Sequence, residues 1–322
     1  MQKSVEPVSL EDTLRFDPHA QIERICTFIR AEVKRRGVHG VLLGLSGGLD
    51  STTCAYLLMR SLPKESIHVL LLPERDSNAA FGVNARTIVR ELDLSAQEKN
   101  LGELFELLGL YRIAPQQVVD NRSGIESFIR LLGWLSGSSF LLNWAQRYAF
   151  DERKGPAARV LRNRFWNYAG RTQAFIFGKL RTRMTVLSSQ AALFDSLMVC
   201  TTDRSEWLVG FYDPLGDGTG DIAPLRHLYK TQIRSLARAL GVPEEIVKQP
   251  SSGDLAAGLP NEVALSVTYE QLDRVLAGLN LGMAEAEIAR QAEVSRARVR
   301  GIRESCELAE QRRRLPVGLE SS

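Results

Sequence analysis

The chain has few of the residues that build disulfide-stabilised or zinc-binding proteins. It contains four cysteines and four histidines among 322 residues. The cysteines are scattered and form no Cys-x-x-Cys pair, so neither a disulfide framework nor a metal cluster is indicated. Buried free thiols in a reducing cytoplasm are the expectation.

Long apolar runs and a strong charge of one sign are also missing. Residues 1–17 are polar and mixed in charge, unlike a signal peptide. The longest apolar stretch, about 128–142, is interrupted by an arginine, glycines and serines, and falls short of a membrane span. A net charge of +3 is too small to indicate nucleic acid or a membrane as partner. With 44% hydrophobic and 25% charged residues, the composition is that of a globular protein with a sizeable core.

Two common catalytic patterns are absent, a Ser-His-Asp arrangement and a Walker A loop. What is present is the run 41–51, VLLGLSGGLDS, in which an apolar strand meets a glycine turn and then a helix. Gly47 and Gly48 let backbone N–H groups approach phosphate oxygens, and the helix start adds further donors. The hydroxyls of Ser46 and Ser51 can donate as well, whereas the Asp50 carboxylate is suited to holding Mg²⁺.

This run resembles the Ser-Gly-Gly-x-Asp-Ser loop of ATP pyrophosphatases, which cleave ATP between its α and β phosphates. The alternative is a glycine turn that serves only packing. The order of strand, loop and helix favours the phosphate-binding interpretation.

The apolar periodicity predicts an α/β fold, a doubly wound parallel sheet with flanking helices. Strands are expected at 41–45, 67–72 and 197–201, and helices at 19–36, 50–60, 79–92, 172–194 and 230–240. We expect one domain over 1–322, with a helical arginine-rich insertion at 122–171 and a helical C-terminal extension at 269–322. Residues 249–265, rich in Gly, Ser and Pro, are expected to form a lid. Ligands of such sheets bind beyond the carboxyl ends of the strands.

A second group of polar residues follows the third expected strand. Glu206 is a carboxylate that could share Mg²⁺ with Asp50. Lys230 opens a helix, where a cation opposes the helix dipole, so a nearby phosphate would explain it. An exposed, solvated lysine is the equally weighted alternative.

Taken together, these runs resemble the ammonia-dependent NAD synthetases over about residues 19–316, with a weak stretch at 122–171. Any one of them is a weak signal, but their order and spacing are specific. The matching runs are Ser46–Ser51, Arg181–Met184, Cys200–Glu206, Gly216-Asp217-Gly218 with Asp221, Tyr229-Lys230, Pro250-Ser251 and Leu259–Leu265.

The resemblance implies a Rossmann-like fold of the adenine nucleotide alpha-hydrolase type and the amidation of deamido-NAD to NAD with ATP, Mg²⁺ and ammonia. Catalytic roles fall to Asp50 and Lys230, and metal binding to Asp50 and Glu206. The residues implied to bind ATP are Gly44, Ser46, Gly47, Gly48, Asp50, Ser51, Thr201, Lys230 and Ser251. Those implied on the acceptor side are Arg181, Arg183, Asp221, Gln311 and Arg312.

Partners are implied in the same way. A homodimer is implied, because partner subunits of the family build the dinucleotide site together. Only about 40 residues precede the loop, too few for an amidase domain. Free ammonia or a separate glutaminase subunit is therefore the expected nitrogen source.

The chain departs from the family pattern mainly on the acceptor side. Tyr212-Asp213-Pro214 replaces Phe-Thr-Lys, Gln311-Arg312 replaces His-Lys, and Asn261 replaces Asp; Cys200 also replaces a glycine. Two interpretations stay open: an NAD synthetase that has diverged, or a related ligase that amidates a different carboxylate.

A DNA-binding protein is the alternative from another class. Residues 287–300 have the pattern of a helix-turn-helix with a basic second helix. The match is short, and the net charge is low for a DNA-binding regulator. Nucleic acid is therefore the less favoured partner.

Overall fold

The computed structural model describes residues 9–113, 156–252 and 260–313, with side chains in the second range from residue 170. Most of the expected insertion, 122–155, and the middle of the expected lid, 253–259, lie outside these residues. Within the part described, no helix has both the length and the apolar character needed to cross a membrane.

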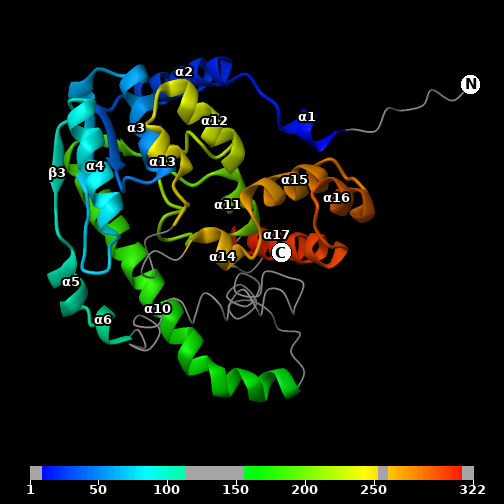
Figure 1. Cartoon of the computed structure of the whole chain (residues 1–322). Helices are drawn as coiled ribbons and strands as arrows, with labels where there is room; N and C mark the ends of the chain where they lie inside the picture. Colours follow the sequence, from blue (N-terminus) through cyan, green and yellow to red (C-terminus); the bar gives the residue numbers. More distant parts are fainter. Residues whose placement is uncertain (1–8, 114–155, 253–259, 314–322) are drawn as a thin grey trace, which may run out of the picture.

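A parallel sheet of four strands forms the centre of the α/β part of the molecule (Figure 1). Its spatial order is β3-β2-β1-β4, which places β1 in the interior of the sheet. The strands are β1 (Gly40–Gly44), β2 (Ile67–Leu71), β3 (Ala96–Glu98) and β4 (Ser196–Met198). In register, Val41 of β1 faces Ile67 of β2 and Leu197 of β4. All strands therefore end at the same edge, where ligands of such sheets bind.

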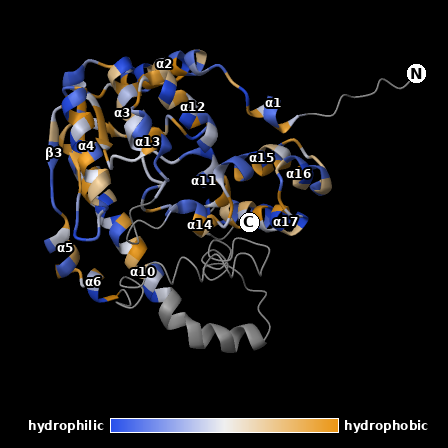
Figure 2. Cartoon of the chain, viewed as in Figure 1, coloured by the Kyte–Doolittle hydropathy of each residue, from blue (hydrophilic) through white to orange (hydrophobic). Residues whose placement is uncertain are grey.

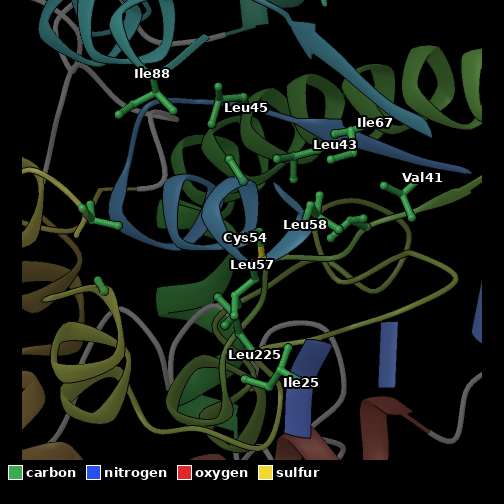
Figure 3. Packing of buried hydrophobic residues seen from close by; sticks show 14 of the residues in the cluster. Ile25, Val41, Leu43, Leu45, Cys54, Leu57, Leu58, Ile67, Ile88 and Leu225 are labelled. Carbon is green, nitrogen blue, oxygen red and sulfur yellow. The ribbon is translucent and has the colours of Figure 1, made fainter. Parts of the chain in front are cut away.

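Alternate residues along the strands supply two apolar layers, one on each face of the sheet. Val41, Leu43 and Val69 belong to the larger layer, packed with helices α2 (Pro18–Arg36), α3 (Leu49–Ser61) and α12 (Lys230–Leu240). Figure 3 shows part of this layer, with residues such as Cys54, Leu57 and Ile25 close together. Leu42, Leu70 and Met198 face the opposite side. There they meet Leu187 and Ala191 of the long helix α10 (Pro156–Leu193). Burial on both faces explains why the interior strand β1 is continuously apolar.

The helix limits follow from their end residues. Asp17 caps α2 by accepting from the N–H groups of His19 and Ala20, and Pro18 opens the helix. Gly37 ends it in the left-handed conformation, with φ +66°. The remaining short elements of the first half are α4 (Ala79–Glu91), α5 (Gly102–Leu107), α6 (Leu110–Ile113) and the 3₁₀ turn η1 (Lys64–Ser66).

A second apolar core lies among the C-terminal helices, beside the sheet half (Figure 1). It includes Tyr269, Leu272, Val299 and Ile302, and Leu10 of α1 (Leu10–Leu14) joins it from the start of the chain. Figure 2 shows the alternation of apolar and polar residues on these helices. The helices of this core are α11 (Arg204–Val209), α14 (Asn261–Leu265), α15 (Tyr269–Asn280), α16 (Glu285–Gln291) and α17 (Arg296–Arg313). The short helix α13 (Glu244–Lys248) instead packs into the first core through Ile246 and Val247. Helix α17 packs along α11 and buries Val299, whereas Arg296 and Arg300, in the stretch expected to read DNA, are exposed.

The doubly wound fold predicted from the sequence is confirmed. Three details were wrong. The short polar strand β3 was not recognised, and α10 begins at Pro156 rather than near residue 172. The end of the expected lid, Asn261–Leu265, is the helix α14 rather than a loop. The four cysteines are free, and three of them are buried.

Candidate active site

The turn between β1 and α3 has a conformation that only glycine accommodates. Gly47 has φ +82°, and a Cβ added there would lie 2.0 Å from the carbonyl oxygen of Phe81. Gly48 is the N-cap of α3 and provides no side-chain cap. The first-turn N–H groups of α3 are therefore not capped by a side chain of the N-cap residue, as an anion-binding helix start requires. Gly44, at the end of β1, packs against Leu187: a Cβ added to Gly44 would lie 3.0 Å from a Leu187 methyl carbon.

The two serine hydroxyls of this turn are bonded to each other. Ser46 Oγ and Ser51 Oγ lie 2.9 Å apart, and Ser46 Oγ accepts from the N–H of Gly48 at 3.3 Å. Ser51 Oγ also donates to the carbonyl of Gly48 at 3.3 Å. These bonds hold the turn in shape. Without a bound ligand, the two hydroxyls expected to donate to phosphate therefore stabilise the turn itself.

Beside the turn, a buried lysine is surrounded by three carboxylates. Lys230 Nζ lies 2.7 Å from Asp50 Oδ2, 2.6 Å from Asp203 Oδ2 and 3.1 Å from Glu206 Oε1. The side chains of Lys230 and Asp203 have no exposed surface, and that of Glu206 is 13% exposed. Lys230 is therefore neither an exposed lysine nor unpaired at its helix start, since carboxylates neutralise its charge.

The electrostatics of this group follow from burial and mutual repulsion. Burial, with the charge of Asp50, raises the pKa of Asp203 to about 6. Burial and the charge of Asp203 raise the pKa of Glu206 to about 8. Burial disfavours the ammonium of Lys230, but Asp203, Asp50 and Glu206 outweigh it and raise its pKa well above the usual value. The site thus holds more negative charge than one lysine balances.

The donor set fits a divalent cation. One carboxylate oxygen from each of Asp50, Asp203 and Glu206 lies within 4.8 Å of the others. Asp50 Oδ1 is buried and has no hydrogen-bond partner among the residues that the structure describes. Oxygen ligands of this kind suit Mg²⁺. The structure thus brings together Asp50, Glu206 and Lys230, as expected from the sequence, and adds Asp203.

Asp203 was missed because its pattern has an ordinary explanation. It is the N-cap of α11, and its Oδ1 accepts from the N–H of Glu206 at 2.8 Å. From the sequence, an aspartate that only caps a helix cannot be distinguished from one that also contacts a charged side chain. The one available signal was its place, directly after a strand at the ligand edge.

The other residues expected on the ATP side lie on adjoining loops. Thr201 follows β4 and is partly buried. Ser251 Oγ is buried without a hydrogen-bond partner among the described residues, while the Ser251 carbonyl accepts from the N–H of Asn261 at 2.8 Å. The segment around Ser251 is thereby tied to α14.

Residues expected on the acceptor side fall into separate places. Arg181 donates twice to the buried carboxylate of Asp213, at 2.7 and 3.1 Å. Arg312 is buried and donates to the carbonyls of Gly210 and Tyr212, at 3.2 and 2.8 Å. It therefore holds the end of α11, near Asp213 and Arg181, and burial lowers its pKa.

The remaining acceptor-side residues contact other parts of the chain. Arg183 lies 3.7 Å from Glu74, which follows β2. Asp221 accepts from Arg36 at 3.0 Å and from the N–H of Met198 at 2.9 Å. Gln311 is exposed on α17. The expected acceptor residues therefore do not form one cluster within this chain.

Comparison with known proteins gives consistent results. The family model of NAD synthase matches residues 21–124 and 169–316, leaving out 125–168. The NH₃-dependent NAD⁺ synthetase of Coprothermobacter proteolyticus is 33% identical over 268 residues, covering 83% of this chain and 87% of that protein. The protein of the same name from Pyrococcus horikoshii is 30% identical over 298 residues, covering 92% of this chain and 93% of that protein.

Solved structures share the fold at lower identity. The NMN synthetase from Francisella tularensis has a TM-score of 0.67 at 19% identity, covering 95% of this chain and all of that one. The NH₃-dependent NAD synthetase from Campylobacter jejuni has a TM-score of 0.62 at 23% identity, with the same coverage.

Proposed function

Because the chain belongs to the NAD synthase family, we propose that it amidates deamido-NAD to NAD with ATP and ammonia, releasing AMP and pyrophosphate. Relatives at 30–33% identity carry the name NH₃-dependent NAD⁺ synthetase over most of their length. The observation that supports the proposal best is the group of Asp50, Asp203 and Glu206 around Lys230, next to the glycine turn. A phosphate-binding turn beside acidic metal ligands suits an ATP-cleaving site.

In this proposal the turn binds the phosphates of ATP. Gly44 and the residues from Ser46 to Ser51 form the loop, with the N-terminus of α3 directed at the pyrophosphate. Thr201 and Ser251 contact the rest of the nucleotide from the adjoining loops. The buried hydroxyl of Ser251, which has no partner among the described residues, supports such a role, because a ligand would provide one.

Asp50 and Glu206 would hold Mg²⁺, with Asp203 beside them. When bound, the cation neutralises negative charge on the pyrophosphate. Asp203 keeps Lys230 in place and, by capping α11, fixes the helix that carries Glu206. Lys230 supplies a positive charge for the leaving pyrophosphate, since its raised pKa keeps it protonated.

The chemistry explains why these groups are needed. A carboxylate is a poor acylating agent because its leaving group would be oxide. Transfer of AMP to the carboxylate gives an acyl-adenylate, and ammonia then displaces AMP to form the amide. The protein contributes by positioning the reactants and neutralising charge, so no nucleophilic serine or cysteine is required.

The acceptor would bind on the side of the site that carries the arginines. Arg181 and Arg183 would meet the anionic acceptor together with Asp221, Gln311 and Arg312, and a homodimer would complete the site. The nitrogen donor is free ammonia or the product of a separate glutaminase. We propose the cytoplasm as location.

One contact of Arg181 favours a second candidate acceptor. Arg181 is engaged by Asp213 through two hydrogen bonds, so part of its charge is already neutralised. An acceptor with fewer phosphates than deamido-NAD, the acid precursor of NMN, is therefore a candidate. The Francisella tularensis fold relative bears the name NMN synthetase.

The test is a pyrophosphate-release assay with ATP, Mg²⁺ and ammonia. Deamido-NAD, the acid precursor of NMN and unrelated carboxylates are compared as acceptors. We expect AMP and pyrophosphate in equal amounts with deamido-NAD. Formation of ADP and phosphate would exclude the mechanism, whereas turnover with another acceptor alone would change only the substrate.

A further inference from the structure

Glu206 is held from a direction that the three-carboxylate group does not explain. Its Oε1 accepts from the hydroxyl of Tyr269 at 3.2 Å, in addition to Lys230. The amide of Asn261 donates to the same Oε1 at 3.4 Å and to the Tyr269 oxygen at 3.1 Å. Two residues from α14 and α15 thus converge on one carboxylate oxygen of α11.

Tyr269 is a rigid donor. Its side chain is fully buried in the C-terminal core, and its ring lies 5.1 Å from the Lys230 ammonium. It is the first residue of α15, where Thr268 and Gln271 form a capping box. The Tyr269 N–H also donates to Glu262 Oε1 at 2.9 Å. Backbone and ring are both fixed, so the hydroxyl has a fixed position.

Glu206, by contrast, stands on a short helix. α11 has six residues, and a glutamate side chain has several rotamers. Lys230 alone does not select one of them, because it also interacts with Asp50 and Asp203. A donor that contacts Glu206 and neither of the other carboxylates is needed to orient it, and Tyr269 meets that condition among the contacts described.

We propose that Tyr269, supported by Asn261, is a positioning residue that orients Glu206 for sharing a divalent cation with Asp50. The inference rests on the metal role in the proposed function. It assigns to the C-terminal helices a part in metal binding that goes beyond packing. Groups that orient metal ligands typically change metal affinity 10–100-fold when removed.

Tyr269→Phe tests this, because it removes the hydroxyl and keeps the ring that fills the core and faces Lys230. The probe is Mn²⁺, titrated into the full chain and followed by electron paramagnetic resonance of the free ion, with and without a non-hydrolysable ATP analogue. We expect Mn²⁺ affinity to fall about tenfold. Circular dichroism should be unchanged.

Tyr56→Phe is the matched control, since Tyr56 also donates to a carboxylate, Glu91 Oε1 at 2.6 Å, on other helices. It should leave Mn²⁺ affinity unchanged. In a Glu206→Gln background, Tyr269→Phe should have no further effect on Mn²⁺ binding. Wild-type Mn²⁺ affinity in Tyr269→Phe, or an equal loss in Tyr56→Phe, would overturn the inference.

The failures of the two proposals are distinguishable. The binding assay contains no acceptor, so a wrong acceptor leaves its result unaffected. If the wild-type chain binds no Mn²⁺ even with the ATP analogue, the metal role itself fails, and the orienting role of Tyr269 fails with it.

Discussion

Lys230 Nζ lies 2.7 Å from Asp50 Oδ2, although the two residues are 180 positions apart in the sequence. The contact joins the start of α12 to the start of α3 at the edge where β1 ends. An ammonium group therefore lies among the carboxylates that are proposed to bind a divalent cation. Lys230 and that cation would neutralise the same carboxylates, so removing the lysine should change how the protein responds to Mg²⁺.

Lys230→Met should destabilise the protein and make its stability dependent on Mg²⁺. Removing one partner of a buried ionic group typically costs about 3–5 kcal/mol, because the other charges stay buried. The free energy of unfolding, measured by urea titration, should recover more on adding Mg²⁺ than it does in wild type, while pyrophosphate release is lost. An Mg²⁺ response equal to that of wild type would contradict this.

Asp50→Asn and Glu206→Gln should each lower the rate of pyrophosphate release by about 100-fold or more, a loss typical of essential charge-stabilising groups. Both changes conserve shape, so far-ultraviolet circular dichroism should not change. Tyr56→Phe serves again as the control. A variant that releases pyrophosphate at the wild-type rate would show that its carboxylate is not a metal ligand.

Gly47→Ala should destabilise the fold far more than Gly37→Ala. Both glycines have positive φ, +82° and +66°, so both substitutions have a conformational cost of about 1 kcal/mol. Only at Gly47 would the new Cβ meet backbone, 2.0 Å from the Phe81 oxygen, whereas nothing lies within 4 Å at Gly37. We expect Gly47→Ala to lower the free energy of unfolding by about 3 kcal/mol or more. Equal urea midpoints would contradict the turn geometry.

Asp273 should make stability depend on pH. It is fully buried in α15 and accepts from Ser205 Oγ and Thr231 Oγ1, at 2.5 and 2.7 Å. Burial raises its pKa to about 6 from the usual 3.8. The folded state thus binds this proton more tightly than the unfolded state does. The resulting stabilisation is complete below about pH 4 and is lost as the pH rises through about 6.

Asp273→Asn removes that titration. The difference in unfolding free energy, wild type minus variant, should fall by about 2 kcal/mol between pH 4 and pH 7. Urea titrations at four or five pH values measure it. A difference that stays constant with pH would show that Asp273 keeps an ordinary pKa in the folded protein.

Much of the fold was accessible from the sequence because its signals are local. The strands at Val41 and Ile67 are apolar on both faces, and helix α12 was predicted with its observed limits, Lys230–Leu240. The family resemblance is confirmed by the match over 21–124 and 169–316. The strand β3 was missed because Ala96–Glu98 is short and polar, and only its pairing with β2 makes it a strand.

The site was only partly accessible. Asp50 and Glu206 were expected from the sequence to share a cation, with Lys230 near a phosphate, and the structure shows that the three side chains lie together. Tyr269 gave no signal, because an aromatic residue opening an amphipathic helix usually belongs to the core. It does belong to the core, and its hydroxyl nevertheless reaches Glu206. Such double roles depend on tertiary contacts and cannot be recognised from residue type.

The ion-pair group draws its members from three distant stretches of the chain, which contain Asp50, Asp203 with Glu206, and Lys230. Tyr269 joins from a fourth stretch. A nascent chain that has emerged only as far as β3 can build the glycine turn but has none of its later partners. We therefore expect ATP cleavage only when the C-terminal helices have docked. Truncations before residue 269, which remove Tyr269 and most of the C-terminal core, should therefore lose ATP cleavage even where they retain the sheet.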